Sequence, residues 1–543
     1  MPCPTCKNDF LIRPEDQKIY EKIGPMIAGK KYTIESPKHC PNCRKQRRLS
    51  FRNERNLFRR SCNLTQKPFI ALYPQDSKYT VYNSAAWWSD AWDALDYGRD
   101  FDFNEPFFEQ FRELMEKVPH LGMINSYNEN SDYCAHSIYY KDSYICVSGV
   151  ECENCYYTYF ANHSKDCMDC AIIFRGERCY ECINCENVSF SIFAQECRNS
   201  HDLIACADMA GCANCIGCAG LRNKNYYLFN EEVSKKDFEE YKKNLHENWE
   251  KEFPIVKEKF EKLRAQTPCK ALQLVNTENA IGDHLQNCKN AYDAFYCENL
   301  EDAAYCWNIP KKGKDIIDMN YSPSCETSAE GVSALNAQNT FATITCWDVS
   351  DVFYSILCFN SKNLFGCFGL RNKNYCILNK QYTQEEYEKL VPQIIEHMGG
   401  IGRAHGASAE PVGGQWSQFF PSELSFFPYD QSVAQEYFPK EMTPEKIEKS
   451  QSSTSETPDI HTCKTCSKKY KIIAQEKNFY KEMKIPTPEI CPECRHKQRQ
   501  ERKASNFLWN RKCDKCLTET KTSWPPNKAQ KIYCEKCYLA EMY

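Results

Sequence analysis

The chain has 543 residues, a formal net charge of -4 at pH 7 and 36 cysteines. This length favours several domains and provides ample chain for a buried core. The sequence contains no apolar run of about eighteen residues, and its start lacks a basic segment followed by an apolar one. We therefore expect no membrane span and no secretory signal, and predict a cytoplasmic protein.

The net charge conceals basic ends and an acidic middle, because Lys and Arg outnumber Asp and Glu only near the two ends. Basic ends suggest contact with phosphate or with the acidic centre of the same chain. In a long cytosolic chain, abundant cysteines indicate metal binding more often than disulfides. The cysteines fall into two populations, one terminal and one central.

The chain opens with two CxxC pairs, Cys3 with Cys6 and Cys40 with Cys43. Two such pairs supply four thiolates in a tetrahedron, as in structural zinc sites, and leave no open position for catalysis. We therefore predict a zinc-ribbon module with a basic helix and an aromatic extension over residues 1–125.

The basic stretch 44–60 follows the second pair and contains neither Pro nor Gly, so a helix is predicted there. Its arginines share one face at helical spacing and are suited to phosphate. The candidate nucleic-acid contacts are Arg44, Arg48, Arg52, Arg55 and Arg59. The alternatives are a solvated face, or a face paired with the acidic middle.

Residues 40–87 align with residues 491–538 at a constant offset of 451. Cys62 then matches Cys513, the first ligand of the last cysteine set. The other three ligands of that set fall on Thr65, Asn83 and Ala86. The N-terminal module is therefore predicted to have lost a second zinc site. A packed aromatic core is expected in its place, from Trp87, Trp88 and Trp92.

Between Cys134 and Cys218 the cysteines are separated by multiples of three, and the stronger period is twelve. An inward side chain at every third residue of a twelve-residue coil predicts a thin β-solenoid over residues 126–230. Its bore fits small side chains. The coil geometry resembles that of antifreeze β-solenoids with twelve-residue coils. Their outward Thr-x-Thr array is missing here, so ice binding is not implied.

Two strips face outward from these coils. The apolar strip should be covered by the other rod or by a helix; it contains Tyr144, Ile145, Tyr156, Tyr157, Met168, Tyr180, Ile192, Phe193 and Ile204. The polar strip suits hydrogen bonds at turns, with a carboxylate cluster for glycan cleavage as the alternative; it contains Asp142, Asn154, Asp166, Asp202 and Asn214.

Small side chains at every third residue recur over residues 269–380, which predicts a second β-solenoid there. Its phase breaks at residues 310–323, where we expect a loop that leaves the rod. The heptapeptide at residues 220–226 recurs at residues 369–375, an offset of 149. It is interpreted as a conformational switch at the end of each rod, or as a basic contact site.

At the offset of 149 the cysteine Cys215 meets Leu364, which could not be a metal ligand. The central cysteines are therefore interpreted as small core residues. The alternatives are redox-active or disulfide-paired thiols, and a metal store.

Helical caps are predicted over residues 231–268 and 381–398. Each starts with a capping box, Ser234 to Asp237 and Thr383 to Glu386, and would cover an open sheet edge. Residues 399–460 are rich in Gly and then in Ser, Thr and Glu, which predicts a linker. Its aromatic part, residues 416–438, is expected to dock on the body.

Residues 461–543 are predicted to be a double zinc-ribbon module. Its two ligand sets are Cys463, Cys466, Cys491 and Cys494, and Cys513, Cys516, Cys534 and Cys537. Further candidate nucleic-acid contacts are Arg495, Arg499 and Arg502. The pattern of CxxC, a Phe/Tyr-rich stretch, CPxCR and a basic run resembles a zinc-ribbon family. That family includes long cysteine-rich proteins of candidate-phyla bacteria. The resemblance implies bound zinc.

Together these observations predict a multidomain, mainly β fold with helices. Zinc-ribbon or treble-clef-like modules flank two short β-solenoids, each ending in a capping helix. No hydrolase, nucleotide-binding or metalloprotease motif is found, so a non-enzymatic scaffold with three Zn²⁺ ions is predicted. Its basic modules would bind nucleic acid, such as structured RNA. The rivals are a protein–protein adaptor and a thiol redox protein or solenoid enzyme.

Overall fold

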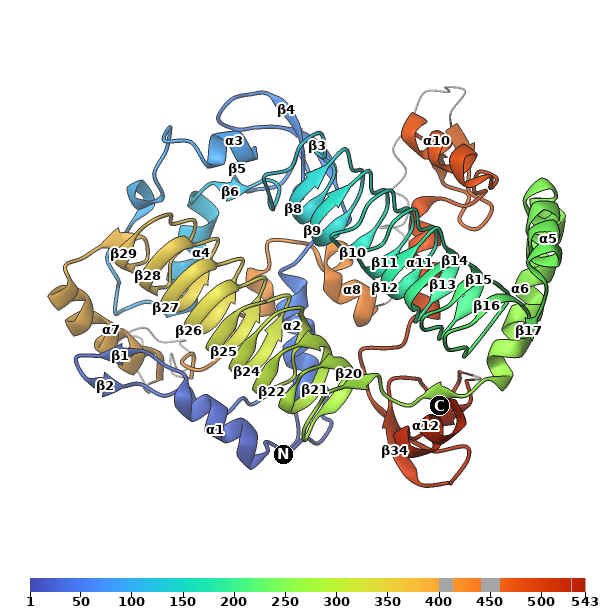
Figure 1. Ribbon diagram of the computed structural model, residues 1–543. Helices are drawn as coiled ribbons and strands as arrows, with labels where there is room; N and C mark the ends of the chain where they lie inside the picture. The colour runs from blue at the N-terminus through green and yellow to red at the C-terminus, as the bar shows by residue number, and fades with distance from the viewer. Residues whose placement is uncertain (400–413, 441–459, 529, 543) are drawn as a thin grey trace. The chain divides into compact units, whose positions relative to one another are not determined.

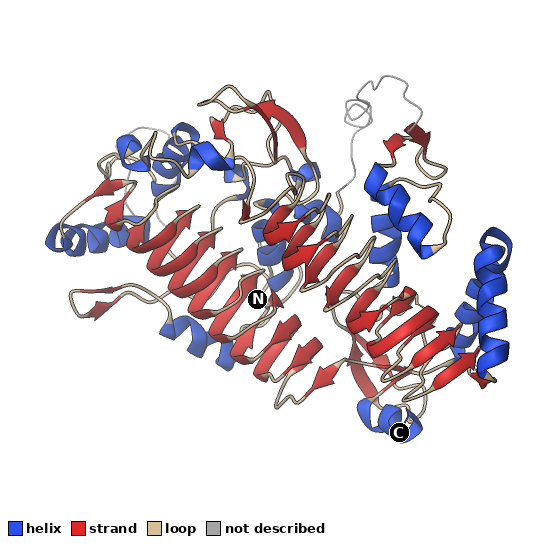
Figure 2. Ribbon diagram, turned by 45° about the horizontal axis from the view of Figure 1, so that its top comes forward, coloured by secondary structure: helices blue, strands red, loops and turns tan. Residues whose placement is uncertain are grey.

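The computed structural model describes residues 1–399, 414–440, 460–528 and 530–542. It contains both helices and strands and divides into two compact units (Figures 1 and 2). Unit 1 combines residues 1–123 with residues 273–440, and unit 2 combines residues 124–272 with the described residues after 459. Each unit therefore joins one cysteine-rich end of the chain to the repeat that is remote from it in sequence. The predicted linker 399–460 lies outside the described residues at 400–413 and 441–459.

Unit 2 contains a stack of parallel strands, drawn cyan to green in Figure 1, which ends in one antiparallel strand. Its strands are β7 (Asn125–Ser126), β8 (Ala135–Lys141), β9 (Val147–Glu153), β10 (Tyr159–Asn162), β11 (Ala171–Phe174), β12 (Ile183–Ser189), β13 (Ile192–Gln195), β14 (Arg198–Ala207), β15 (Ala213–Ile216), β16 (Asn225–Leu228) and β17 (Glu231–Glu232). Neighbouring residues are twelve apart, as in Ala135 beside Val147 and Tyr159 beside Ala171. We call this the first stack.

Unit 1 contains the second stack, which also ends in one antiparallel strand. Its strands are β19 (Leu274–Val275), β20 (Ile281–Gln286), β21 (Lys289–Glu298), β22 (Leu300–Ala304), β23 (Trp307–Ile309), β24 (Gly313–Asn320), β25 (Cys325–Val332), β26 (Leu335–Ile344), β27 (Trp347–Ile356), β28 (Phe359–Phe365), β29 (Asn374–Ile377) and β30 (Lys380–Gln381). The expected loop at 310–323 is wrong, because β24 pairs with both β22 and β25. Leu300 pairs with Gly313, one residue beyond the usual spacing of twelve. This single extra residue explains why the small inward residues shift by one position in the sequence pattern.

The interior of the stacks explains their preference for Cys and Ser. The Ser143 hydroxyl accepts a hydrogen bond from the N–H of Cys155, one coil later, at 3.1 Å. The Cys155 thiol donates to the carbonyls of Glu153 and Ser164, at 3.5 and 3.6 Å. A small side chain with a polar atom thus satisfies backbone groups that no water reaches.

The backbone adopts positive φ at every third residue from His136 to Tyr226. Asn and Asp tolerate this left-handed conformation better than other non-glycine residues. Several of them stack between coils: the Asn154 amide donates to Asp166 at 3.1 Å, and Asn130 donates to Asp142 at 2.7 Å. Most of the polar strip therefore bonds along the stack, side chain to side chain, whereas Asp202 pairs with Lys242 of α5 (Lys235–Glu247) at 2.6 Å.

A helix follows each stack. In unit 2 these are α5 (Lys235–Glu247) and α6 (Trp249–Gln266), and in unit 1 α7 (Gln384–Gly399). The Thr383 capping box is confirmed, since the Thr383 hydroxyl accepts from the N–H of Glu386 at 3.2 Å and the N–H of Thr383 donates to the Glu386 carboxylate at 2.9 Å. At Ser234 the N-cap half is confirmed, since the hydroxyl accepts from the N–H of Asp237 at 3.1 Å. The apolar strip of the first stack packs on α5, α6 and the C-terminal cysteine-rich module.

The N-terminal module contributes short elements to unit 1. They are α1 (Pro14–Lys22), β1 (Met26–Ile27), β2 (Lys30–Lys31), α2 (Pro41–Ser50), β3 (Phe58–Ser61), β4 (Pro68–Ala71), β5 (Val81–Tyr82), α3 (Ser84–Trp87), η1 (Ala94–Tyr97), α4 (Phe107–Lys117) and β6 (His120–Leu121). The helix predicted over 44–60 is shorter than expected: α2 ends at Ser50, so Arg52, Arg55 and Arg59 lie beyond it. Trp87 and Trp92 are buried, but Trp88 is 40% exposed.

The C-terminal module repeats this layout in unit 2. Its elements, with the β18 strand that pairs with it, are β18 (Cys269–Lys270), β31 (Ile460–Thr462), β32 (Lys469–Lys471), α10 (Ala474–Met483), α11 (Pro492–Arg502), β33 (Trp509–Lys512), β34 (Glu519–Thr522), β35 (Ile532–Tyr533) and α12 (Glu535–Met542).

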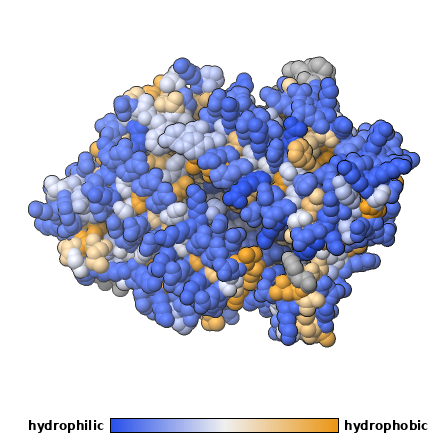
Figure 3. All heavy atoms as spheres, in the orientation of Figure 1, coloured by the Kyte–Doolittle hydropathy of each residue, from blue (hydrophilic) through white to orange (hydrophobic). Residues whose placement is uncertain are grey.

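Residues 414–440 of the predicted linker form η2 (Ser422–Leu424), η3 (Tyr429–Gln431) and α8 (Val433–Tyr437). Phe419 and Phe420 of this segment are buried in unit 1, where both rings contact the ring of Phe51. The face drawn in Figure 3 is mostly hydrophilic, with scattered apolar patches. None of the described helices combines the length and the apolar character needed to cross a membrane.

Candidate metal centres and the arginine helices

The twelve terminal cysteines predicted as ligands gather into three groups of four. Within each group the four sulfur atoms lie within 4.8 Å of one another. The groups are Cys3, Cys6, Cys40 and Cys43; Cys463, Cys466, Cys491 and Cys494; and Cys513, Cys516, Cys534 and Cys537. In the described part of the chain no other cluster of this kind is found. Each group could hold one metal ion.

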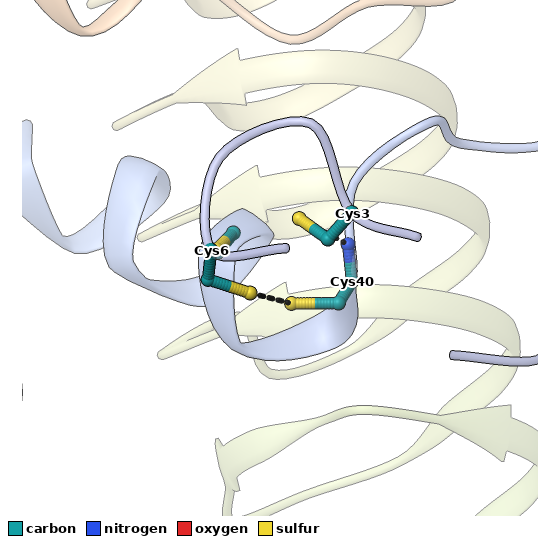
Figure 4. Close-up of side chains that lie close together, drawn as sticks. Cys3, Cys6 and Cys40 are labelled. Carbon is teal, nitrogen blue, oxygen red and sulfur yellow. Dashed lines mark hydrogen bonds between the residues drawn. The ribbon is translucent and has the colours of Figure 1, made fainter. Parts of the chain in front are cut away.

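In the first group Cys3 and Cys6 lie at a turn, while Cys40 directly precedes α2 and Cys43 lies in its first turn. Figure 4 shows Cys3, Cys6 and Cys40. Cys40 is the N-cap of α2, and Pro41 begins the helix. The sulfur atoms of Cys6 and Cys40 are 3.6 Å apart, and the N–H of Cys40 donates to the Cys3 sulfur at 3.4 Å. A helix N-terminus and backbone N–H groups both favour negatively charged sulfur.

The second and third groups have the same geometry. The sulfur–sulfur distance is 3.7 Å between Cys466 and Cys491 and 3.8 Å between Cys516 and Cys534. Burial raises the pKa of the Cys463 thiol, but hydrogen bonds from the backbone of Cys491 and Cys466 outweigh it and lower the pKa to about 6. One thiol of the group is therefore readily ionised near neutral pH, as a metal ligand must be.

The N-terminal module keeps the backbone geometry of the C-terminal Cys513 group at the equivalent place, but only one of the four cysteines. The N–H of Asn83 donates to the Cys62 sulfur at 3.4 Å, and the matching N–H of Cys534 donates to Cys513 at 3.3 Å. The side-chain amide of Asn83 donates to the Thr65 hydroxyl at 3.3 Å. A hydrogen bond thus joins two positions that are occupied in the C-terminal copy by Cys516 and Cys534, members of a group that could hold a metal ion.

The arginines predicted to contact nucleic acid lie mostly in the interior. Arg44 and Arg48 in unit 1 and Arg495 and Arg499 in unit 2 have at most 2% of their surface exposed. Arg52 is buried beside Glu54, with 2.6 Å between Nε and the carboxylate. The prediction of phosphate contacts is therefore wrong for these five side chains, because a buried guanidinium that is already paired cannot reach an external phosphate.

The three remaining arginines differ from one another. Arg502 forms an ion pair with Glu181 and keeps 17% of its side chain exposed. Arg55 is half-buried, and Arg59 is exposed. For Arg55 and Arg59 the nucleic-acid contact stays a prediction.

Four of the five buried arginines, Arg44, Arg48, Arg495 and Arg499, pair with carboxylates on the stack of the same unit. In unit 1 the Nε of Arg44 lies 2.8 Å from Asp318, and Nη1 of Arg48 lies 2.6 Å from Glu330. Burial lowers the pKa of Arg44, but the Asp318 carboxylate and its neighbours outweigh this effect and raise the pKa above its ordinary value. The guanidinium therefore stays charged.

Unit 2 repeats this arrangement with different residues. The Nε of Arg495 lies 2.8 Å from Asp169, and Nη1 of Arg499 lies 2.9 Å from Glu181. Asp169 and Glu181 correspond to Asp318 and Glu330 at the offset of 149, just as the arginines correspond at the offset of 451. The alternative of a basic face paired with the acidic middle is thus the arrangement that the structure shows.

A second contact joins the same partners. Arg222 in the recurring heptapeptide donates to the hydroxyl of Tyr538 in α12, at 2.5 Å. Its counterpart Arg371 donates to the carbonyl of Trp87, which is the residue equivalent to Tyr538, at 2.9 Å. The heptapeptide is therefore a basic contact site for the cysteine-rich module of its own unit.

Sequence reasoning did not identify the carboxylates that bind the arginines. The available signal was their recurrence: Asp169 and Asp318 occupy the same coil position in the two repeats, as do Glu181 and Glu330. No protein-family model matches this chain, and no curated protein matches it.

Proposed function

We propose that this chain is a non-enzymatic protein–protein adaptor whose three four-cysteine groups hold structural zinc ions. The observation that carries this proposal is the burial of the arginine ion pairs in both units. The basic helices serve the fold, since they attach each cysteine-rich module to a stack. The remaining surfaces of the modules and stacks are then available to protein partners.

Zinc is supported by the donor set and its spacing. A tetrahedron with metal–sulfur bonds of about 2.3 Å has edges of about 3.8 Å. In each group one sulfur pair has a separation close to this edge, 3.6 Å for Cys6 and Cys40, 3.7 Å for Cys466 and Cys491 and 3.8 Å for Cys516 and Cys534. Four thiolates leave no coordination position for water or substrate, which supports a structural role and the absence of catalysis. The resemblance to zinc-ribbon proteins agrees with this.

We also propose that each stack is a short β-solenoid, with a bore filled by small side chains. The twelve-residue registers and the inward thiols and hydroxyls support this. None of the cysteines forms a disulfide, and those within the stacks are buried. The central cysteines are then core residues rather than a redox relay.

Nucleic-acid binding is the second candidate function. It is favoured by basic side chains that remain exposed on the same modules, Arg59 and Lys497. Binding through several phosphates would fall steeply as salt increases.

Two measurements on the purified full-length chain test the proposal. Elemental analysis should find three zinc ions per chain. Fluorescence anisotropy with structured RNA and duplex DNA should show no saturable binding between about 50 and 200 mM salt, the range over which phosphate contacts are most salt-sensitive. Tight, salt-dependent binding that Arg59→Glu and Lys497→Glu abolish would overturn the adaptor proposal in favour of the second candidate.

A further inference from the structure

The C-terminal module of unit 2 has a surface on which lysines are concentrated. Residues 467–484 contain six Lys and two Glu, whereas the equivalent residues 7–24 of the N-terminal module contain four basic and four acidic residues. Five of these lysines are exposed and form no ion pair with a residue that the structure describes. We call them the lysine face: Lys468, Lys469, Lys471, Lys481 and Lys484.

The lysine face is on the side of the module that turns away from the first stack. On β32, Tyr470 packs against the core that the module shares with the stack. Lys469 and Lys471 alternate with it along the strand and therefore point to the opposite side. On α10, Tyr480 enters the same core while Lys481 is exposed. The inward aromatic side chains thus fix the outward direction of the lysines.

The two modules share this scaffold, so their difference in charge is confined to the surface. Glu476 and Tyr480 are buried on α10, as Asp16 and Tyr20 are on α1. At the positions of the lysine face the N-terminal module has Asn8, Asp9, Leu11, Glu21 and Gly24. A metal ion with four thiolates would carry the same charge in both modules, so neutralising that centre does not explain the lysines.

The carboxylates of the module leave the lysine face positively charged. Within residues 467–484, Glu476 is buried and pairs with Arg495 at 3.0 Å, which leaves Glu482 as the exposed carboxylate. Beyond this stretch, Glu489 pairs with Lys464. A surface with this excess of positive charge is complementary to an acidic one.

The composition of the face favours carboxylates over nucleic acid as its partner. It contains lysines and no arginine, and it is the planar guanidinium that forms bidentate contacts with phosphate. Binding of single strands also uses exposed aromatic rings on which bases stack. The rings of Tyr470, Phe479 and Tyr480 are instead directed into the core.

We propose that the lysine face binds an acidic segment of a partner protein, in which several Asp or Glu side chains pair with the lysines. The inference rests on the adaptor function proposed above and names the kind of partner that one surface accepts. Because the lysines are exposed, salt screens their attraction for the partner.

The test uses a rhodamine-labelled peptide of ten glutamates and the full-length chain. Anisotropy should show saturable binding that weakens as salt increases from about 50 to 200 mM. The double variant Lys469→Glu/Lys471→Glu should weaken binding at least tenfold, and so should Lys481→Glu/Lys484→Glu. A peptide of ten glutamines should not bind.

The matched control is Lys30→Glu/Lys31→Glu, which reverses two exposed lysines of β2 in the N-terminal module. Binding of the glutamate peptide should be unchanged in this variant. The zinc content of each variant shows whether its modules remain folded, and all the lysines replaced are exposed.

Absence of saturable binding by the glutamate peptide, or an equal loss in the control and in the two lysine-face variants, would overturn the inference. Tighter binding of duplex DNA or structured RNA that the lysine-face variants abolish would also overturn it, because the partner would then be nucleic acid. If the zinc content is as expected and neither the peptide nor nucleic acid binds, the adaptor proposal stands without this site.

Discussion

Arg499 and Asp169 form an ion pair in which the two groups are 2.8 Å apart and neither side chain is exposed to solvent. Arg48 and Asp318 form the matching pair in the other unit, at 3.1 Å. Removing two charges from water is costly, so such a pair is tolerated only when both partners are present and well placed. The pairs therefore specify which surface of the stack receives each cysteine-rich module.

Removal of one carboxylate should destabilise unit 2. In Asp169→Ala the guanidinium groups of Arg495 and Arg499 lose their shared partner, and we expect a cost of about 3–5 kcal/mol in the free energy of unfolding. Urea unfolding and limited proteolysis of the C-terminal module would measure it. The control is Asp166→Ala on a neighbouring position of the same stack, whose more exposed carboxylate should be worth about 0–1 kcal/mol. Equal effects of the two changes would contradict this prediction.

The metal content of the chain should change only when one of the predicted ligand cysteines is replaced. Cys494→Ser should reduce the metal content by one ion per chain and unfold its module, since a structural zinc site contributes about 10–16 kcal/mol of apparent binding free energy. Elemental analysis after gel filtration is the measurement. Cys62→Ser is the matched control: Cys62 occupies the equivalent of a ligand position, yet its group lacks the other three thiols. Loss of an ion in the control would show that Cys62 is a ligand after all.

The lost site of the N-terminal module should be recoverable. Its Cys62 turn has the same backbone hydrogen bond as the Cys513 turn, 2.9 Å in both. Thr65→Cys, Asn83→Cys and Ala86→Cys together should therefore create a fourth site and raise the metal content by one ion per chain. Cobalt substitution would report it as an additional tetrahedral thiolate spectrum. An unchanged ion count with the fold intact would mean that the turn has moved too far from ligand geometry.

Acid should destabilise unit 1 partly through His120. Burial lowers the pKa of this imidazole from 6.5 to about 3, and Nε2 donates to the Met115 carbonyl at 2.9 Å. Because the unfolded chain takes up a proton below pH 6.5 and the folded one does not, stability is complete above pH 6.5 and falls as pH decreases towards 3. The slope is about 1.4 kcal/mol for each pH unit.

The variant His120→Gln tests this contribution. Its free energy of unfolding should be lower at neutral pH but should depend less on pH between 6.5 and 4 than that of the wild type. His163→Gln serves as the control, because that imidazole is 53% exposed. If His120→Gln had the same pH profile of the free energy of unfolding as the wild type, His120 would not be the cause of that pH dependence.

The thiols of the stacks should react slowly. Burial raises the pKa of Cys297 and of Cys367 well above the ordinary value, so little thiolate is present to react. After chelation of the metal under native conditions, a thiol reagent should modify the terminal cysteines rapidly and the central ones only on unfolding. Mass spectrometry of digested samples would assign the labels. Rapid labelling of the central cysteines would instead support a redox role.

The sequence by itself determined the local chemistry. The paired CxxC motifs identified all twelve terminal cysteines that gather into groups able to hold a metal ion, because a tetrahedral site needs four thiolates in short turns and the spacing of Cys463 and Cys466 is typical of such a turn. The helix caps at Ser234 and Thr383 could also be predicted from the sequence, since a cap depends on two residues that are three positions apart. Composition also indicated that the basic ends could bind the acidic middle.

Only the tertiary structure decided which module meets which repeat. Residues 40–50 pack on a stack that begins more than two hundred residues later, while the C-terminal module packs on the first repeat. Nothing local in the sequence distinguishes an arginine that meets Asp318 from one that meets a phosphate, because both partners are anions. The choice depends on long-range packing that buries the guanidinium, and burial is a property of the folded chain.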